Sequence, residues 1–147
     1  MNTFGNVLRL TTFGESHGPA VGGVLDGLPP GLTVDFGLVR EMMARRRPGS
    51  SPLTSARREA DEVEFLSGIS PDGRTLGTPV AFIICNGDTR PGDYEQLRHL
   101  FRPNHADYTY QAKYGLRDHR GGGRASARET AARVAAAALA MLVLRRE

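Results

Sequence analysis

The glycine-rich segment Gly121–Thr130 is the part of the sequence best suited to bind an anion. It reads Gly-Gly-Gly-Arg-Ala-Ser-Ala-Arg-Glu-Thr, so a permissive loop that carries arginine leads into the start of a predicted helix. The free N–H groups at a helix start attract phosphate. The spacing matches neither the dinucleotide-binding fingerprint nor the Walker loop. The segment therefore predicts an anion site, with a well-capped helix start as the alternative.

Two histidines occupy settings in which an imidazole could exchange a proton near neutral pH. His17 lies in the turn Gly14–Gly18, where glycines let the backbone approach a ligand. His105 follows Arg102 and precedes Asp107, two charged groups that could set its orientation. For both histidines the alternative is an exposed turn residue without a function. We therefore treat His17 and His105 as candidate acid–base residues.

Arginine supplies nearly all of the positive charge. The chain has 19 lysines and arginines, and Lys113 is the only lysine among them. A guanidinium group binds carboxylate or phosphate through two parallel hydrogen bonds, so the cluster Arg45-Arg46-Arg47 predicts small anionic ligands. The alternative for this cluster is a solvated helix end whose dipole favours cations. The scattered arginines fit a coding bias.

Apolar runs and turn signals predict the elements that position these residues. Strands are expected at residues 7–13, 20–26, 62–66 and 78–86. Helices are expected from the cap Asp35 to about Arg46, at residues 93–100 and 105–114, and from about Ser126 onward. The polar segment 49–60 should be an exposed loop.

The last helix should begin with a capping box formed by Ser126 and Glu129. Helical spacing predicts that it packs through the stripe Thr130, Val134, Ala137, Met141 and Leu144. Alanines on its other faces indicate close contacts there too.

Length and composition fit one soluble, cytoplasmic globular domain. The 147 residues are 39% hydrophobic and 24% charged, which suffices for a core. No window approaches the roughly 20 apolar residues of a membrane span, and the N-terminus lacks a secretory signal. Cys85, the only cysteine, should be a buried inert thiol, so we expect neither a disulfide nor a metal site. The net charge of +3 and the absence of tryptophan and of known motifs disfavour a nucleic-acid binder.

Taken together and in this order, the segments resemble chorismate synthase over all 147 residues. The most specific ones are Gly14–Gly18 continuing to Asp26-Gly27, and Gly123–Thr130 continuing to Arg133-Val134. Three further segments look like family segments at family spacing: Arg45–Gly49, Arg102–Tyr108 and Lys113–Gly115.

The resemblance implies an α+β fold, a β-α-β sandwich of which residues 1–147 form only the N-terminal part. It implies a lyase of the shikimate pathway of aromatic amino acid biosynthesis. The reaction is a 1,4-anti elimination of phosphate from 5-enolpyruvylshikimate 3-phosphate to give chorismate. Reduced FMN would be the cofactor, with NADPH as a second one if the enzyme reduces its own flavin. The complete enzyme is expected to be a cytoplasmic homotetramer without nucleic-acid or membrane partners.

The resemblance also implies residue roles. His17 corresponds to the histidine that protonates reduced flavin, and His105 to the one that assists the departing phosphate. The substrate's anionic groups would be held by Arg46, Arg47, Arg102 and Arg128. FMN would contact Arg124, Ala125 and Ser126. Many members carry Arg-Ser-Ser at these three positions, so Ala125 can contribute only its backbone. Pro52 likewise stands where many relatives have a further anion-binding arginine.

Length is the largest departure from the family pattern. Members are more than twice as long as this chain, and their C-terminal half adds flavin and substrate contacts. The resemblance therefore implies that this chain alone is inactive or impaired. The alternative is a non-catalytic fragment that binds flavin or another anion, which binding without turnover would identify.

Overall fold

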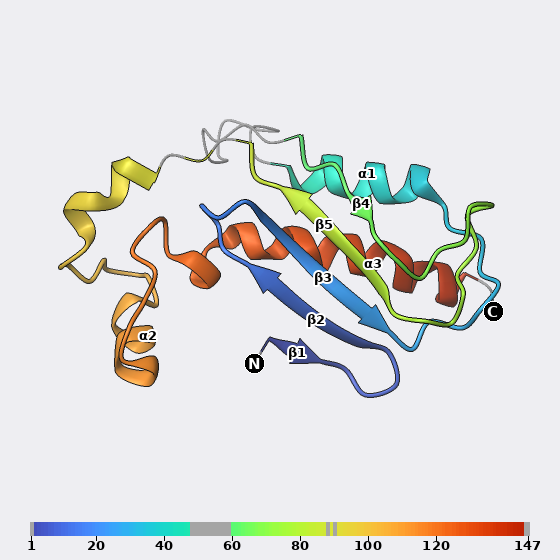
Figure 1. The fold of residues 1–147 in the computed structure, drawn as a ribbon, viewed down its shortest axis with the longest axis horizontal. Coiled ribbons are helices and arrows are strands. Elements are labelled where there is room, and N and C mark those ends of the chain that lie inside the picture. Colours follow the sequence, from blue (N-terminus) through green and yellow to red (C-terminus); the bar gives the residue numbers. More distant parts are fainter. Residues whose placement is uncertain (1, 48–59, 88, 90, 146–147) are drawn as a thin grey trace.

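The computed structural model describes residues 2–47, 60–87, 89 and 91–145. Its centre is a 5-stranded antiparallel sheet in the order β1-β2-β3-β5-β4 (Figure 1). The strands are β1 (Thr3–Phe4), β2 (Arg9–Gly14), β3 (Ala20–Asp26), β4 (Glu64–Phe65) and β5 (Val80–Cys85). The expected bounds of β3 are confirmed, whereas β2, β4 and β5 are shifted or shorter than expected.

Alternation of side chains explains which face of the sheet is covered. In β5, Val80, Phe82 and Ile84 are buried, while Ala81 and Ile83 are only partly covered. The expectation that Cys85 is buried was wrong, because it is exposed at the end of this strand. An alternating strand turns only every second residue toward the core, and Ile84 already occupies that position.

Two helices, α1 (Phe36–Arg46) and α3 (Thr130–Leu144), cover one face of the sheet (Figure 1). The expected cap of α1 is confirmed, since Oδ1 of Asp35 accepts a 2.9 Å hydrogen bond from the N–H of Leu38. The core lies between the sheet and these helices, where Val39 and Met43 of α1 pack with the buried strand residues. The architecture is α+β.

The packing stripe expected for α3 was wrong at three of its five positions, whereas Val134 is partly buried and packs against the core. Thr130, Ala137 and Leu144 are exposed, and the buried face consists of alanines and one leucine: Ala131, Ala132, Ala135, Ala136, Ala138 and Leu139. Small side chains let α3 lie close to both the sheet and α1, where large ones would not fit. The expectation of close contact through alanine is confirmed.

The start of the last helix differs from the expected capping box. Oγ of Ser126 accepts from the N–H of Arg128 at 3.3 Å, as a cap should. Glu129 does not close the box, because its carboxylate accepts a hydrogen bond from Thr12 in β2 instead. A short 3₁₀ turn, Ala127–Glu129, therefore precedes α3.

A lobe of short helices extends beyond one end of the sheet (Figure 1). It contains the 3₁₀ segment Pro91–Leu97, α2 (Asp107–Tyr114) and the 3₁₀ turn Gly123–Ala125. The helix expected at residues 93–100 is thus a 3₁₀ segment, and the one expected from residue 105 begins later. The expected loop at residues 49–60 lies outside the described residues except for Ala60. No helix in the described ranges is long and apolar enough to cross a membrane.

Phe82 provides a test of this core. It is fully buried and meets Phe65 edge-on, with ring centroids 6.1 Å apart. Phe82→Ala should lower the free energy of unfolding by about 3–5 kcal/mol, since it leaves a cavity beneath the helices. Urea unfolding followed by circular dichroism measures this. Ile83→Ala, on the other face of β5, should cost clearly less, and equal costs would contradict the assigned faces.

Candidate functional site

Three consecutive glycines, Gly121–Gly123, form the centre of the candidate site. Their φ angles are 65°, 88° and 52°, a region in which a side chain is strained. Each glycine also lies so close to other residues that an added Cβ atom would press against them. The loop expected before the last helix is therefore confirmed at Gly121 and Gly122. Its neighbours come from distant parts of the sequence.

His17 lies against Gly121. A Cβ atom on Gly121 would be 2.5 Å from Nε2 of His17 and 3.3 Å from Oγ of Ser16. The imidazole also meets the ring of Tyr94, with centroids 4.9 Å apart and planes inclined by 57°. Ser16 is buried, and its Oγ donates a hydrogen bond to the carbonyl of Gly121 at a distance of 3.5 Å. The histidine turn and the glycine tract therefore hold each other in place.

His105 and Arg102 lie at the next glycine. A Cβ atom on Gly122 would be 3.1 Å from Nη2 of Arg102 and 3.7 Å from Nδ1 of His105. Nε and Nη2 of Arg102 donate to the two carboxylate oxygens of Asp107 at 2.8 and 3.0 Å. These hydrogen bonds lower the pKa of Asp107 to about 2. The structure thus brings a predicted catalytic histidine and a predicted substrate arginine together, and a buried carboxylate presets the arginine.

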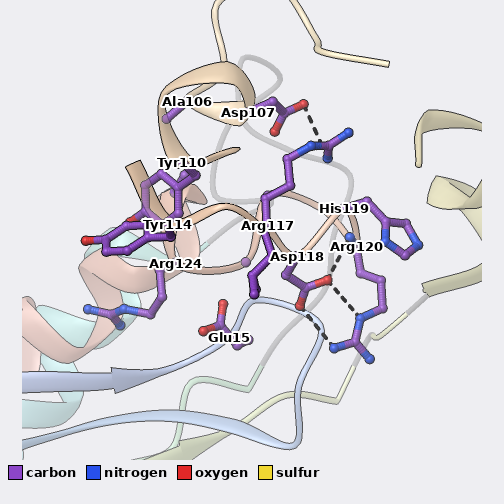
Figure 2. A pocket seen from close by; sticks show the side chains of 14 residues that line it. Glu15, Ala106, Asp107, Tyr110, Tyr114, Arg117, Asp118, His119, Arg120 and Arg124 are labelled. Carbon is purple, nitrogen blue, oxygen red and sulfur yellow. Dashed lines mark hydrogen bonds and ion pairs between the residues drawn. The ribbon is translucent and has the colours of Figure 1, made fainter. Parts of the chain in front are cut away.

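A cavity of about 620 Å³ lies beside the tract, between α2 and residues 116–125 (Figure 2). Its lining includes aromatic and basic side chains, among them Tyr110, Tyr114, Arg117, His119, Arg120 and Arg124. Cavities of this size bind cofactors and other small molecules. The predicted residues Arg124 and Ala125 line it, whereas the described lining includes neither His17 nor His105. Gly122 belongs to the lining and also approaches His105, so the cavity and the histidines are adjacent.

Besides Asp107, two carboxylates line this cavity among the cations, Glu15 and Asp118 (Figure 2). Gly123 makes room for both, because a Cβ atom there would collide with Oε2 of Glu15 and lie 3.0 Å from Cβ of Asp118. Arg120 donates two hydrogen bonds to Asp118, at 2.9 and 3.0 Å. Burial raises the pKa of Glu15, the charge of Asp118 adds to this effect, and Arg124 opposes it. Glu15 is therefore a protonatable group on the cavity wall.

Arg124 links the cavity to the sheet. Its Nη2 donates to Oγ1 of Thr12 at 2.6 Å and to Oε1 of Glu129 at 3.2 Å, and its Nη1 donates to the carbonyl of Gly14 at 3.3 Å. Thr12 in turn donates to Glu129 at 2.8 Å, and Arg133 pairs with Glu129 at 3.0 Å. An anion in the cavity would meet an arginine whose position is already fixed.

Two further arginines predicted to bind substrate, Arg46 and Arg128, meet on Asp61. Nη1 of Arg46 donates to one oxygen of this buried carboxylate at 2.7 Å, and Nη1 of Arg128 donates to the other. Arg128 also donates from Nε to Oδ1 of Asn86 at 2.8 Å and from Nη2 to the carbonyl of Cys85 at 3.2 Å. Only 3% of the Arg128 side chain is exposed. This guanidinium is part of an internal network, and its role toward a substrate stays a prediction.

The remaining predicted residues lie close to this network. Asn86 joins it to the histidine turn, because its Nδ2 donates to the carbonyls of Glu15 and Gly18 at 3.0 and 2.8 Å. Ser126 caps the turn that carries Arg128. Arg47 lines a second cavity, of about 440 Å³, which Asp61 also lines. The predicted substrate arginines are therefore divided between the glycine tract and the surroundings of Asp61.

Sequence reasoning missed Tyr94, Asp61 and Asn86. None of them belongs to a recognisable motif, and each reaches its partner only through the folded structure. Glu15 carried a signal, since it stands two residues before His17 in a glycine-flanked turn. Within residues 2–47, 60–87, 89 and 91–145, no group of His, Cys, Asp and Glu side chains is arranged to hold a metal ion.

Gly121→Ala tests whether the glycine tract positions His17. The new methyl group would press on the imidazole, so the side-chain NMR signals of His17 should shift. Gly115→Ala is the matched control, because Gly115 also has positive φ, at 74°, but nothing lies within 4 Å of an added Cβ atom. Both variants should lose about 1–2 kcal/mol of stability from backbone strain. Identical His17 signals in both variants would contradict the packing described.

Asp107→Asn tests the carboxylate that presets Arg102. The folded-state pKa of about 2 lies below the ordinary value of 3.8, so Asp107 stabilises the fold above about pH 4 and loses this effect as the pH falls toward 2. At neutral pH the variant should lose about 2 kcal/mol of unfolding free energy. It should also lose part of the acid dependence, as urea titrations between pH 2 and 7 would show. The control is Asp26→Asn, at an exposed aspartate, which should keep the parent's unfolding free energy at neutral pH.

Comparisons with known proteins agree with the resemblance found in the residues. The family model described as chorismate synthase matches residues 8–147. A chorismate synthase of Bacteroides thetaiotaomicron is 59% identical over 144 residues, which cover 98% of this chain and 40% of that protein. One of Campylobacter concisus is 58% identical over 144 residues, with the same coverage. A crystal structure of chorismate synthase matches with a TM-score of 0.69 and 34% identity, over 96% of this chain and 34% of that one.

The chain therefore spans about two-fifths of the length of the curated relatives that it matches. The α+β fold agrees with that of the solved relative. Since the family model covers nearly all of the sequence, the chain belongs to the chorismate synthase family.

Proposed function

We propose that these residues form part of a site that eliminates phosphate from 5-enolpyruvylshikimate 3-phosphate to give chorismate. The observation that carries the proposal is the convergence of His17, His105 and Arg102 on Gly121–Gly123, beside a cavity of about 620 Å³. The elimination breaks a ring C–O bond to phosphate and a ring C–H bond, and it forms a ring double bond without net redox change. It needs cations for the anionic groups and side chains that exchange protons.

The cavity suits reduced FMN by size and by lining. Tyr110 and Tyr114 supply aromatic surface, and Arg120 and Arg124 supply positive charge for a phosphate. Reduced FMN would supply the transient electron that the family's reaction requires. Arg124, Ala125 and Ser126 are the residues that we propose to contact it, with Ala125 acting through its backbone.

Arg102 is the predicted arginine best placed to receive the substrate. Asp107 presets its guanidinium beside His105, so an anionic group bound there would lie next to an imidazole. In the proposed roles, His105 assists the departing phosphate oxygen with a proton, and His17 exchanges a proton with the reduced flavin. Arg46 and Arg128 already bind Asp61, so a substrate contact by either would require that pairing to change. Arg47 stays a proposed substrate residue.

The length of the chain favours a second candidate, a fragment that binds flavin without turnover. It spans 40% of the relatives' length, and the rest of a complete enzyme would add groups to the site. Reduction of the flavin by NADPH, assembly as a homotetramer and a cytoplasmic location remain expectations from the family resemblance.

Flavin binding tests the cofactor site on this chain directly. FMN should bind, with a change in flavin fluorescence, and Arg124→Gln should weaken binding about 10- to 100-fold, because a hydrogen bond to a charged group is lost. The control is Arg98→Gln, an exposed arginine paired with Glu95, which should bind FMN like the parent chain. If both variants bind FMN with equal affinity, this cavity is not the FMN site.

Turnover separates the enzyme from the binding fragment. It should be measured anaerobically, as chorismate formed, on this chain and on a polypeptide of the relatives' full length that contains these residues. In the longer protein, His105→Ala should slow phosphate release by about 10²–10⁴-fold at unchanged FMN affinity. If the longer protein binds FMN but forms no chorismate, the proposed activity is excluded, and flavin binding without turnover remains as the function.

A further inference from the structure

Tyr94 contacts two residues of the candidate site at once. Its ring centroid lies 4.9 Å from that of His17, and Cζ of Arg102 lies 5.9 Å from the same ring. Tyr94 belongs to the 3₁₀ segment Pro91–Leu97 and is partly buried. It thus connects a predicted proton donor near the N-terminus to a predicted substrate arginine in the lobe.

The ring of His17 has little room to turn. Gly121 lies so close that an added Cβ atom would be 2.5 Å from Nε2, and Tyr94 meets the same imidazole. Orientation matters because a proton passes only when the ring nitrogen is within hydrogen-bond reach of its partner. A contact that fixes the ring therefore decides where its nitrogens point.

Tyr94 itself is held by anchored groups. Arg102, whose guanidinium lies near the tyrosine ring in a cation–π arrangement, is bound by two carboxylate oxygens of Asp107. Oε2 of Glu95, the residue after Tyr94, lies 3.2 Å from Nε2 of His119 on the cavity wall. Arg117 donates to the carbonyl of Leu97 at the end of the segment and to those of Arg98 and Leu100 just beyond it. The backbone on both sides of the contact is therefore anchored, and the tyrosine ring lies between Arg102 and His17.

We propose that Tyr94 is a positioning residue, whose ring, braced by Arg102, holds the imidazole of His17 in the orientation needed for proton exchange. The inference rests on the proposed function, because it concerns the group that we propose to protonate reduced flavin. Both contacts are made by the ring, so the aromatic face carries the effect and the hydroxyl is dispensable.

The orientation is measured on this chain by NMR, independently of any activity. Nuclear Overhauser signals between the imidazole protons of His17 and the protons of Gly121 report the orientation of the ring. These signals should persist in Tyr94→Phe and weaken in Tyr94→Leu. Tyr94→Met is a second ring-free variant, which serves if the leucine variant does not fold. The control is Tyr108→Leu, at a tyrosine that is 65% exposed and meets Phe101. It should leave the His17 signals unchanged.

Kinetics of the longer polypeptide, of the relatives' full length, measure the consequence. Tyr94→Leu should lower kcat by about 10- to 100-fold, the cost of a misplaced acid–base group, while FMN affinity and KM stay near those of the parent. Tyr94→Phe should keep the kcat of the parent protein. If Tyr94 had a purely structural role, Tyr94→Leu would lower stability and FMN binding as well as kcat. Tyr94→Phe would then differ from Tyr94→Leu in all three quantities and not in kcat alone.

The possible failures are distinguishable. If the parent protein forms no chorismate, the proposed function fails, and with it the catalytic meaning of the contact. If the parent is active but Tyr94→Leu keeps the parent's kcat or its His17 signals, the positioning role is wrong and the proposed function stands. If Tyr94→Phe is as impaired as Tyr94→Leu, the hydroxyl is required and the proposal is overturned.

Discussion

The guanidinium of Arg128 ties together segments that must meet before the site exists. Its nitrogens donate to Asp61, to Asn86 and to the carbonyl of Cys85. Asp61 also holds Arg46 at the end of α1, and Asn86 holds the turn that contains His17. A buried guanidinium is tolerated only when its charge is matched and its donors are bonded. This one cation therefore fixes the end of α1, the end of β5 and the histidine turn relative to one another.

The candidate site residues lie close together because the glycine tract between them has no side chains. The backbone of Gly121 lies so close to His17, and that of Gly122 so close to Arg102, that no methyl group fits freely at either glycine. Groups from distant segments can gather around such a backbone without a large void between them. The adjacent cavity has a different character, because Glu15 faces its arginines. A bound anion would favour the protonated form of Glu15, because its negative charge would add to the burial that already disfavours the carboxylate.

Features set by neighbouring residues could be predicted from the sequence. The bounds of β3 follow from an apolar run between two glycine-containing turns, and the cap by Asp35 follows from a side chain beside its own helix start. The buried face of α3 could not be predicted, because alanine and larger apolar residues both repeat at helical spacing. Only the closeness of the sheet and α1 selects the alanines.

The candidate site was predicted in its parts but not in its assembly. Motifs identified His17, His105 and Arg124, because glycine turns and helix starts are visible locally. They could not show that Arg46 and Arg128 share Asp61, which lies 67 residues from Arg128. The contact of Tyr94 with His17 likewise arises only when the lobe packs against the histidine turn. The roles taken from the family resemblance remain predictions, since they depend on groups that bind.

The bonds that join β2 to the last helix have a consequence for synthesis of the chain. Thr12 bonds to Glu129 across 117 residues, and Gly14 bonds to Arg124 across 110. A ribosome adds about 5–20 residues per second, so roughly 6–23 seconds separate the translation of Thr12 from that of Glu129. During this interval β2 and β3 can already pair as neighbours, whereas the histidine turn still lacks the glycine tract against which it packs. All five strands are therefore translated before the glycine tract, and the candidate catalytic groups can meet only after Gly121–Gly123 has been added to the chain.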